Sequence, residues 1–262
     1  MGKTITICFT NNKGGSGKST TCSNLGAAMA QAGKKVLLID GDMQLNLSLA
    51  FFSEDWVLEH ATGEKNLYYA IKKQEDLSCY VVHTPYENLD LIPSSTLMSQ
   101  IEYELFTMIQ REYVLKKCLR SIYEKELYDY VLIDAPPTLG TWVINILCAA
   151  DYVIVPVEAS PWGLFGLANM FDFLNGISEM TEAKIMGVLI TKVDERKNYY
   201  KQTREILAGY DNINVFETFI HVDTSVEWAQ DNSVPVSVYK KSTRSAKEFQ
   251  QLAREVMDYG SR

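Results

Sequence analysis

The stretch that decides the fold reads ITICFTNNKGGSGKST and runs from Ile5 to Thr20. Its first six residues are mostly β-branched or aromatic, which predicts a β-strand over 5–10. The glycine-rich segment after them predicts a loop, and residues 19–32 then repeat apolar side chains at helical spacing. A strand, a glycine-rich loop and a helix in this order place backbone N–H groups and a helix N-terminus where they can hold phosphate.

The residue types in this loop suit phosphate binding. Glycines let the main chain approach closely, Lys18 supplies a cation to the β- and γ-phosphates, and the Ser19 hydroxyl can ligate Mg²⁺. The end of the loop fits the Walker A pattern, although Asn12 stands where that pattern has its first glycine. A dinucleotide-binding fingerprint fails, because it requires glycine where Thr20 stands. The predicted nucleotide-binding residues of the loop are Gly14, Gly15, Ser16, Gly17, Lys18, Ser19 and Thr20.

Strands and helices alternate along the rest of the chain. Gly33 stands where a helix C-terminus is expected, and the apolar run over 36–39 is typical of a parallel strand buried on both faces. A long helical stretch is predicted over about 96–125. Further strands are predicted over 131–133, 152–155 and 186–190, with weaker ones near 80–82 and 89–92. The pattern predicts an α/β fold with a doubly wound, mostly parallel sheet flanked by helices, in a single domain over 1–262.

The amino-acid composition limits the classes of function that the protein can have. The chain has 262 residues, of which 47% are hydrophobic and 22% charged, as is typical of folded soluble proteins. Its formal net charge of −8 means that any contact with nucleic acid must come from a local basic patch. The cysteines lack metal-ligand spacing, which predicts reduced thiols in a cytosolic protein. They are Cys8, Cys22, Cys79, Cys118 and Cys148.

Acidic residues follow two of the predicted strands, at the sheet edge that would carry the loop. Asp42 could orient an attacking water there, and Asp134 could hold Mg²⁺ through water. Asp40 could contact the ion directly or bond to the neighbouring loop, and both roles stay open. The candidate metal residues are Ser19, Asp40 and Asp134, and the candidate catalytic residues are Lys13, Lys18, Asp42 and Asp134.

Residues 13–20 resemble the deviant Walker A box of the ParA, Soj and MinD ATPases. Residues 40–48, 128–137, 149–157 and 242–256 also resemble ParA and Soj, so the likeness covers nearly the whole chain. The resemblance implies a P-loop NTPase with ATP and Mg²⁺ as cofactors. It also implies a homodimer that closes on ATP, in which Lys13 reaches the nucleotide of the partner.

The same resemblance implies a biological role. ParA and Soj dimers bind DNA without sequence preference, and a ParB-like centromere-binding partner stimulates their hydrolysis of ATP. We therefore expect a cytoplasmic, nucleoid-associated protein that partitions a plasmid, a chromosome or a mobile element.

One motif favours guanine instead of adenine as the base of the bound nucleotide. Residues 191–194 read Thr-Lys-Val-Asp and match the guanine-reading box of GTPases, whose aspartate accepts hydrogen bonds that adenine does not offer. Thr191 and Asp194 are therefore candidate base-binding residues. The resemblance favours ATP, and a GTP-using switch protein is an alternative.

A predicted C-terminal helix carries a basic stripe opposite its apolar residues. The candidate DNA contacts are Lys240, Lys241, Arg244, Lys247 and Arg254. Glu248 and Glu255 flank the stripe, as they would on an ordinary solvated face. Soj-like proteins carry Ile-Pro-Arg where residues 220–222 read Ile-His-Val, and the missing cations could come from Arg196, Lys197, Lys201 and Arg204.

Two other classes fit less well. A MinD-like membrane-cycling ATPase needs a terminal amphipathic helix, but the apolar stripe of the C-terminal helix suits a core, so no stable membrane association is expected. An iron protein of the nitrogenase type needs paired cysteines, and neither Cys118 nor Cys148 lies in a matching context.

Overall fold

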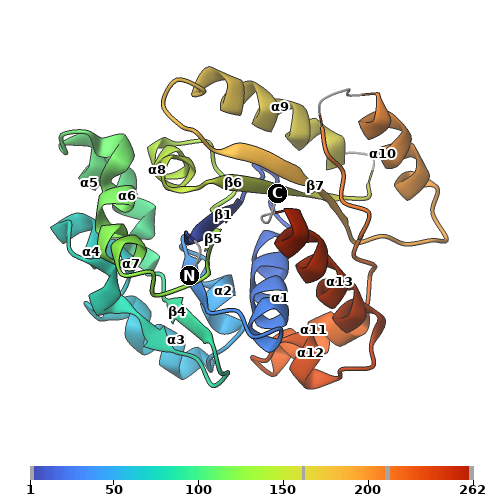
Figure 1. The fold of residues 1–262 in the computed structure, drawn as a ribbon, viewed down its shortest axis with the longest axis horizontal. Helices are drawn as coiled ribbons and strands as arrows, with labels where there is room; N and C mark the ends of the chain where they lie inside the picture. The colour runs from blue at the N-terminus through green and yellow to red at the C-terminus, as the bar shows by residue number, and fades with distance from the viewer. Residues whose placement is uncertain (1–2, 161–162, 210–212, 260–262) are drawn as a thin grey trace.

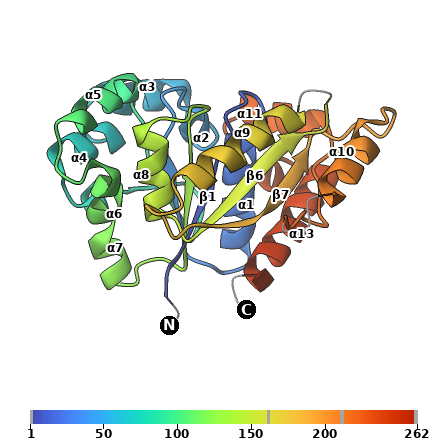
Figure 2. The same cartoon turned by 90° about the horizontal axis from the view of Figure 1, so that it is seen from above.

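The computed structural model describes residues 3–160, 163–209 and 213–259. Seven strands form one sheet in the order β3-β4-β2-β5-β1-β6-β7, with helices on both faces (Figures 1 and 2). Every neighbouring pair is parallel except β3 and β4. The strands are β1 (Ile5–Phe9), β2 (Val36–Asp40), β3 (Val82–His83), β4 (Leu89–Ile92), β5 (Tyr130–Asp134), β6 (Tyr152–Glu158) and β7 (Lys184–Thr191). The predicted doubly wound, mostly parallel sheet is confirmed.

The helices lie between and after these strands. In chain order they are α1 (Lys18–Gln31), α2 (Asn46–Leu49), α3 (Glu54–Thr62), α4 (Leu67–Lys73), α5 (Ile101–Phe106), α6 (Val114–Cys118), α7 (Arg120–Glu124), α8 (Thr141–Ala149), α9 (Gly163–Gly176), α10 (Tyr199–Ala208), α11 (Thr224–Asp231), α12 (Val236–Tyr239) and α13 (Arg244–Tyr259). As predicted, Gly33 follows α1 with a φ of 85°, a conformation that glycine adopts without strain. Within the described ranges, none of the helices combines the length and apolar character that crossing a bilayer requires.

Successive residues of the central strands face opposite sides of the sheet and enter two cores. Leu38 and Leu132 lie in the core that contains α1 and α13. Leu37 and Ile133 lie in the core that contains α4 to α9. Because both faces are covered, these strands read as continuous apolar runs instead of alternating ones.

The predicted long helix over 96–125 is wrong. This segment forms two 3₁₀ turns, η2 (Thr96–Gln100) and η3 (Arg111–Tyr113), separated and followed by the short helices α5, α6 and α7. Gln110 has a φ of 52°, which a continuous helix does not allow. The Asn145 side chain of α8 stabilises the break, because it donates to the Arg111 carbonyl at 2.6 Å and accepts from Leu115 N–H at 3.2 Å.

The weak strand predicted near 80–82 is largely wrong too. Leu77–Tyr80 form the 3₁₀ helix η1, and only Val82–His83 pair with β4. Asp76 accepts a hydrogen bond from Ser78 N–H at 2.8 Å and so caps η1. A side-chain cap of this kind offers the backbone a local alternative to strand pairing.

The central strand should be the most sensitive part of this fold. Leu132 is fully buried and faces α1, where a Cβ at Gly26 would lie 3.4 Å from its Cδ1 and 2.7 Å from Cδ2 of the neighbouring Leu38. We expect Leu132→Ala to lower the free energy of unfolding by about 2–5 kcal/mol, because it leaves a cavity between sheet and helix. The matched control is Leu58→Ala on α3, where 60% of the side chain is exposed, with a change below about 0.5 kcal/mol. Urea unfolding of both variants measures the difference, and equal losses would contradict the proposed packing.

Candidate nucleotide site and basic surface

A cavity of about 1180 Å³ lies over the loop between β1 and α1. Gly17 precedes α1 with a φ of 90°, so this turn needs glycine. Among the described residues, no side chain caps the N-terminus of α1, which leaves its N–H groups and its positive dipole end directed at the cavity. The predicted loop residues Gly14, Gly15, Ser16, Gly17, Lys18, Ser19 and Thr20 all line this cavity.

Charged groups are buried beneath the loop. The sheet register places Asp40 directly beside Asp134, and Lys18 lies close enough to Asp134 and Asp42 to favour their charged forms. Burial raises the pKa of Asp134 well above its usual value, and the negative charge of Asp40 raises it further. Burial also lowers the pKa of Lys18, against the opposing effect of Asp134 and Asp42. The site therefore concentrates negative charge that one lysine does not balance.

The carboxylate of Asp40 accepts hydrogen bonds from the loop that follows it. Its Oδ2 accepts hydrogen bonds from Ser48 N–H at 2.9 Å and from the Ser48 hydroxyl at 2.6 Å, and its Oδ1 accepts from Asp42 N–H at 3.3 Å. Burial raises the pKa of Asp40 to about 7 in spite of these bonds. This geometry favours the second of its two open roles, in which it holds the 42–48 segment in place.

The carboxylate of Asp134 fits a bound cation. It is fully buried, and neither oxygen has a hydrogen-bond partner of ordinary geometry in the part of the chain that the structure describes, although the Ser19 hydroxyl favours its charged form. The hydroxyl of Ser16 is also buried and has no hydrogen-bond partner among the described residues. No three described His, Cys, Asp or Glu side chains converge as a protein-built metal centre would. Mg²⁺ usually takes one or two protein ligands, with waters and phosphates completing its shell, so the donor set fits Mg²⁺ held with a nucleotide.

Lys13 lies beside the cavity and is held by a strand end. Its ammonium group donates to Glu158 Oε2 at 2.9 Å and to the Ser160 hydroxyl at 3.2 Å. Burial would raise the pKa of Glu158, but the hydrogen bond and charge of Lys13 keep it below its usual value. The ammonium group of Lys13 is therefore held at the end of β6, whereas Lys18 lines the cavity. The sequence interpretation missed Glu158, which stands at the carboxyl end of β6 as Asp40 and Asp134 do at theirs.

The two candidate base-binding residues are separated. Thr191 donates to the Ser16 carbonyl at 2.8 Å and so supports the loop. Asp194 instead forms two hydrogen bonds with the Arg196 guanidinium, at 2.8 and 2.9 Å, which lower its pKa to about 2. Lys192, between them, lines the cavity, whereas Asp194 is not among its described lining residues.

The far wall of the cavity was not predicted. It is formed by residues 230–234, which are the last two residues of α11 and the three that follow, and the Gln230 amide donates to the Thr20 hydroxyl at 3.1 Å. The polar run Gln-Asp-Asn-Ser was the available signal, but its distance from the loop in sequence hid it.

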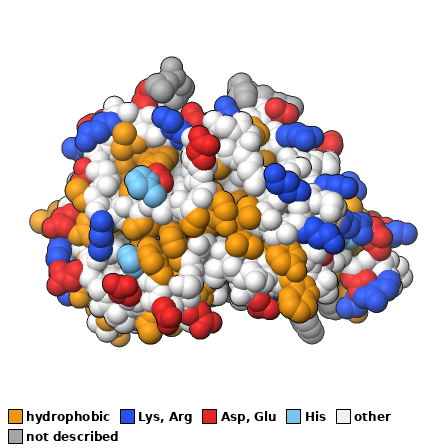
Figure 3. Space-filling view, turned by 90° about the horizontal axis from the view of Figure 1, so that it is seen from below, with side chains coloured by type: hydrophobic (Ala, Val, Ile, Leu, Met, Phe, Trp, Pro, Cys, Tyr) orange, Lys and Arg blue, Asp and Glu red, His pale blue; other side chains and the backbone are white. Residues whose placement is uncertain are grey.

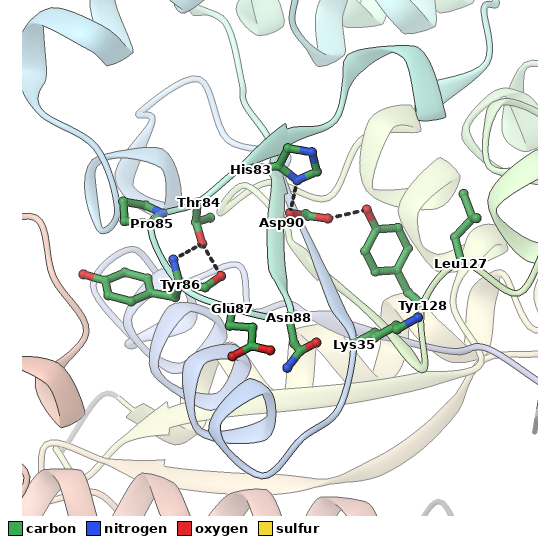
Figure 4. A pocket seen from close by; sticks show the side chains of 10 residues that line it. All are labelled: Lys35, His83, Thr84, Pro85, Tyr86, Glu87, Asn88, Asp90, Leu127 and Tyr128. Carbon is green, nitrogen blue, oxygen red and sulfur yellow. Dashed lines mark hydrogen bonds and ion pairs between the residues drawn. The ribbon is translucent and has the colours of Figure 1, made fainter.

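A second cavity, of about 530 Å³, opens at the amino ends of β2, β4 and β5 (Figure 4). Asp90 accepts hydrogen bonds there from the Tyr128 hydroxyl at 2.7 Å and pairs with His83 at 2.7 Å. Pro85 and Tyr86 line both cavities. Ligands of open α/β sheets bind at the carboxyl ends of the strands, so the larger cavity is the candidate site.

Lys and Arg side chains gather on the right of Figure 3, over the half of the molecule that carries α10 and α13. The two glutamates of α13 face inward. Glu255 accepts from Glu217 and Thr218 N–H at 2.8 and 3.1 Å, and Glu248 accepts from His221 N–H at 3.0 Å. The side chains left exposed are Lys240, Lys241, Lys247 and Arg254, together with Arg196, Lys197, Lys201 and Arg204 of the neighbouring segment.

Arg244 differs from the other candidate DNA contacts. It is half-exposed, and its guanidinium bonds to Glu195 at 2.8 Å and to Glu248 at 3.1 Å. The buried His221 side chain lies in the same cluster and contacts both glutamates. Arg244 therefore joins α13 to the segment after β7, and its charge is largely neutralised.

Comparison with known proteins agrees with this architecture. A family model described as an AAA domain matches residues 4–187. The sporulation initiation inhibitor protein Soj of Bacillus subtilis is 36% identical over 262 residues, which cover 99% of this chain and 100% of that protein. The chromosome-partitioning ATPase Soj of Treponema pallidum is 34% identical over 259 residues, which cover 98% of each chain.

A solved structure gives the same result. A plasmid partition protein of Borrelia burgdorferi, bound to AMPPNP, superposes with a TM-score of 0.81 at 25% identity, covering 98% of this chain and 99% of that one. The predicted resemblance is thus confirmed in both sequence and fold. The chain belongs to the Soj/ParA family of partition ATPases.

Proposed function

We propose that residues 1–262 act as one ATPase domain that dimerises on ATP, binds DNA without sequence preference, and hydrolyses ATP faster when a ParB-like partner engages it. The observation that carries this proposal is the inward bonding of Glu248 and Glu255, which leaves the outer face of α13 cationic. DNA binding of this kind depends on phosphate contacts and not on base readout. The role that follows is the partition of a replicon on the nucleoid.

The nucleotide chemistry follows from the buried charges. ATP and Mg²⁺ are the cofactors, and the residues that would hold the ion are Ser19 and Asp134. Bound Mg²⁺ supplies a Lewis acid that neutralises charge on the phosphates. Lys18 binds the β- and γ-phosphates, and the N–H groups of the loop donate to their oxygens. Asp42, whose Oδ1 accepts from Gln44 N–H at 3.1 Å, orients the attacking water with its other oxygen.

The structural observations favour this function over the alternatives. The GTP-using alternative depends on Asp194, whose carboxylate is taken by Arg196. The membrane-cycling alternative depends on an available amphipathic helix. The apolar residues of α13, including Phe249 and Leu252, are buried in the core with α1, so this helix does not offer them to a membrane.

Lys18→Ala should weaken ATP binding by about two orders of magnitude, because a buried charge-assisted contact to the phosphates is lost. The matched control is Lys65→Ala, an exposed lysine in the other half of the molecule. Titration with a fluorescent ATP analogue measures both dissociation constants. Equal affinity in Lys18→Ala and the parent would contradict the assignment of the loop.

Lys13→Ala should keep ATP binding within about threefold of the parent but lose ATP-dependent dimerisation and at least about tenfold in turnover. The reason is that Lys13 is held by Glu158 within its own chain and is proposed to act on the nucleotide of the partner. Light scattering with ATP measures the dimer, and phosphate release measures turnover. Normal dimers with normal turnover would make Lys13 an ordinary loop lysine.

The DNA surface can be tested by charge reversal. Lys247→Glu with Arg254→Glu should weaken ATP-dependent retention on nonspecific DNA about tenfold or more, since fewer phosphate contacts release fewer counterions. Retention by the parent should also fall steeply with salt. The control with the same change in net charge is Lys65→Glu with Lys125→Glu on the opposite half. If both double variants lose retention equally, net charge and not α13 accounts for binding.

A further inference from the structure

One buried side chain that is not among the proposed nucleotide contacts, Trp142, touches the segment that carries Asp42. Trp142, in the first turn of α8, is only 2% exposed, and its indole N–H donates to the Gly41 carbonyl at 2.9 Å. Gly41 is the residue between Asp40 and Asp42. The hydrogen bond therefore reaches the peptide that joins the two acidic residues after β2.

The opposite side of Gly41 is also fixed. Its N–H donates to the Asp134 carbonyl at 2.9 Å. A Cβ at this position would lie 2.6 Å from that carbonyl oxygen, so any side chain would push the two strand ends apart. Gly41 is thus held between the end of β5 and the indole of Trp142, which leaves the backbone before Asp42 little freedom.

The helix that carries Trp142 is itself held from outside. Glu102 of α5 accepts hydrogen bonds from Thr141 N–H at 3.0 Å and from Trp142 N–H at 3.1 Å. A carboxylate at a helix N-terminus satisfies free N–H groups and interacts favourably with the helix dipole. Glu102 therefore sets where α8 begins, and with it the position of the indole.

We infer that Trp142 is a positioning residue for ATP hydrolysis. It holds Asp42 in place through Gly41, and Glu102 holds Trp142. The inference deepens the proposed function, because it depends on the role given there to Asp42. An apolar side chain of similar size would fill the same core, but only a donor can satisfy the buried Gly41 carbonyl.

The test separates turnover from binding and from stability. Trp142→Phe keeps an aromatic ring and removes the N–H. It should lower kcat about tenfold, because a displaced Asp42 orients the attacking water less well, while the dissociation constant for Mg-ATP stays within about twofold. The matched control, Trp56→Phe on α3, removes an indole in a different environment and should leave kcat within about twofold.

Two further variants make every outcome decisive. Glu102→Gln leaves the core intact and should lower kcat about threefold with unchanged affinity for Mg-ATP, so it carries the test if Trp142→Phe does not fold. Parental kcat in either folded variant would overturn the inference, as would losses of affinity and kcat in equal proportion. Asp42→Ala is the reference: if it retains parental turnover, the role of Asp42 in the proposed function fails instead.

Discussion

The burial of the Asp134 carboxylate, which has no hydrogen-bond partner of ordinary geometry among the described residues, is the constraint on which the rest of this site depends. A fully buried carboxylate is unfavourable in its charged form unless a cation or a donor compensates it. Here the end of β5 lies between β1 and β2, so the phosphate loop and Asp40 are brought against it by strand pairing alone. The fold thus leaves a buried carboxylate to be compensated, and under the proposed function a bound cation would compensate it.

That constraint also limits the backbone around it. The Asp134 carbonyl accepts the N–H of Gly41, so the two acidic strand ends move together or not at all. Asp40 adds a second restraint, because its bonds to Ser48 fold the following segment back on the strand. Asp42 differs from both, because it lines the cavity and only its Oδ1 is used by the scaffold, accepting from Gln44 N–H. This placement suits the role proposed for it, in which it orients a water.

Sequence patterns predicted those parts of the fold whose causes are local. The runs over 36–39 and 131–133 are apolar at every position because both faces of the sheet are covered, and the loop at 13–20 is contiguous in sequence. The segment over 96–125 could not be predicted, because a side chain from α8, Asn145, determines where its helices break. No pattern within that segment records this contact.

The same distinction applies to the site. Glu158 could have been found by extending to β6 the rule that identified Asp134, since both end parallel strands at one edge. Gln230 could not, because only the tertiary fold brings it to Thr20. Asp194 remains a prediction: a four-residue match suggested a base contact, and in the structure the arginine two residues later bonds the carboxylate.

The C-terminal helix shows that the charge of an exposed surface depends on which charged side chains face the solvent, and not on how many the helix contains. In sequence, Glu248 and Glu255 interrupt a basic stripe and argue for an ordinary solvated surface. In the structure, both carboxylates accept backbone N–H groups of the 217–221 segment, which runs beside β7, and Glu248 also bonds the buried His221 imidazole at 2.5 Å. The glutamates therefore serve the packing of α13, as Phe249 does, and contribute less to the field outside. An acidic protein can in this way present a cationic face without any excess of Lys and Arg, because field strength at a surface depends on which charges are turned toward it.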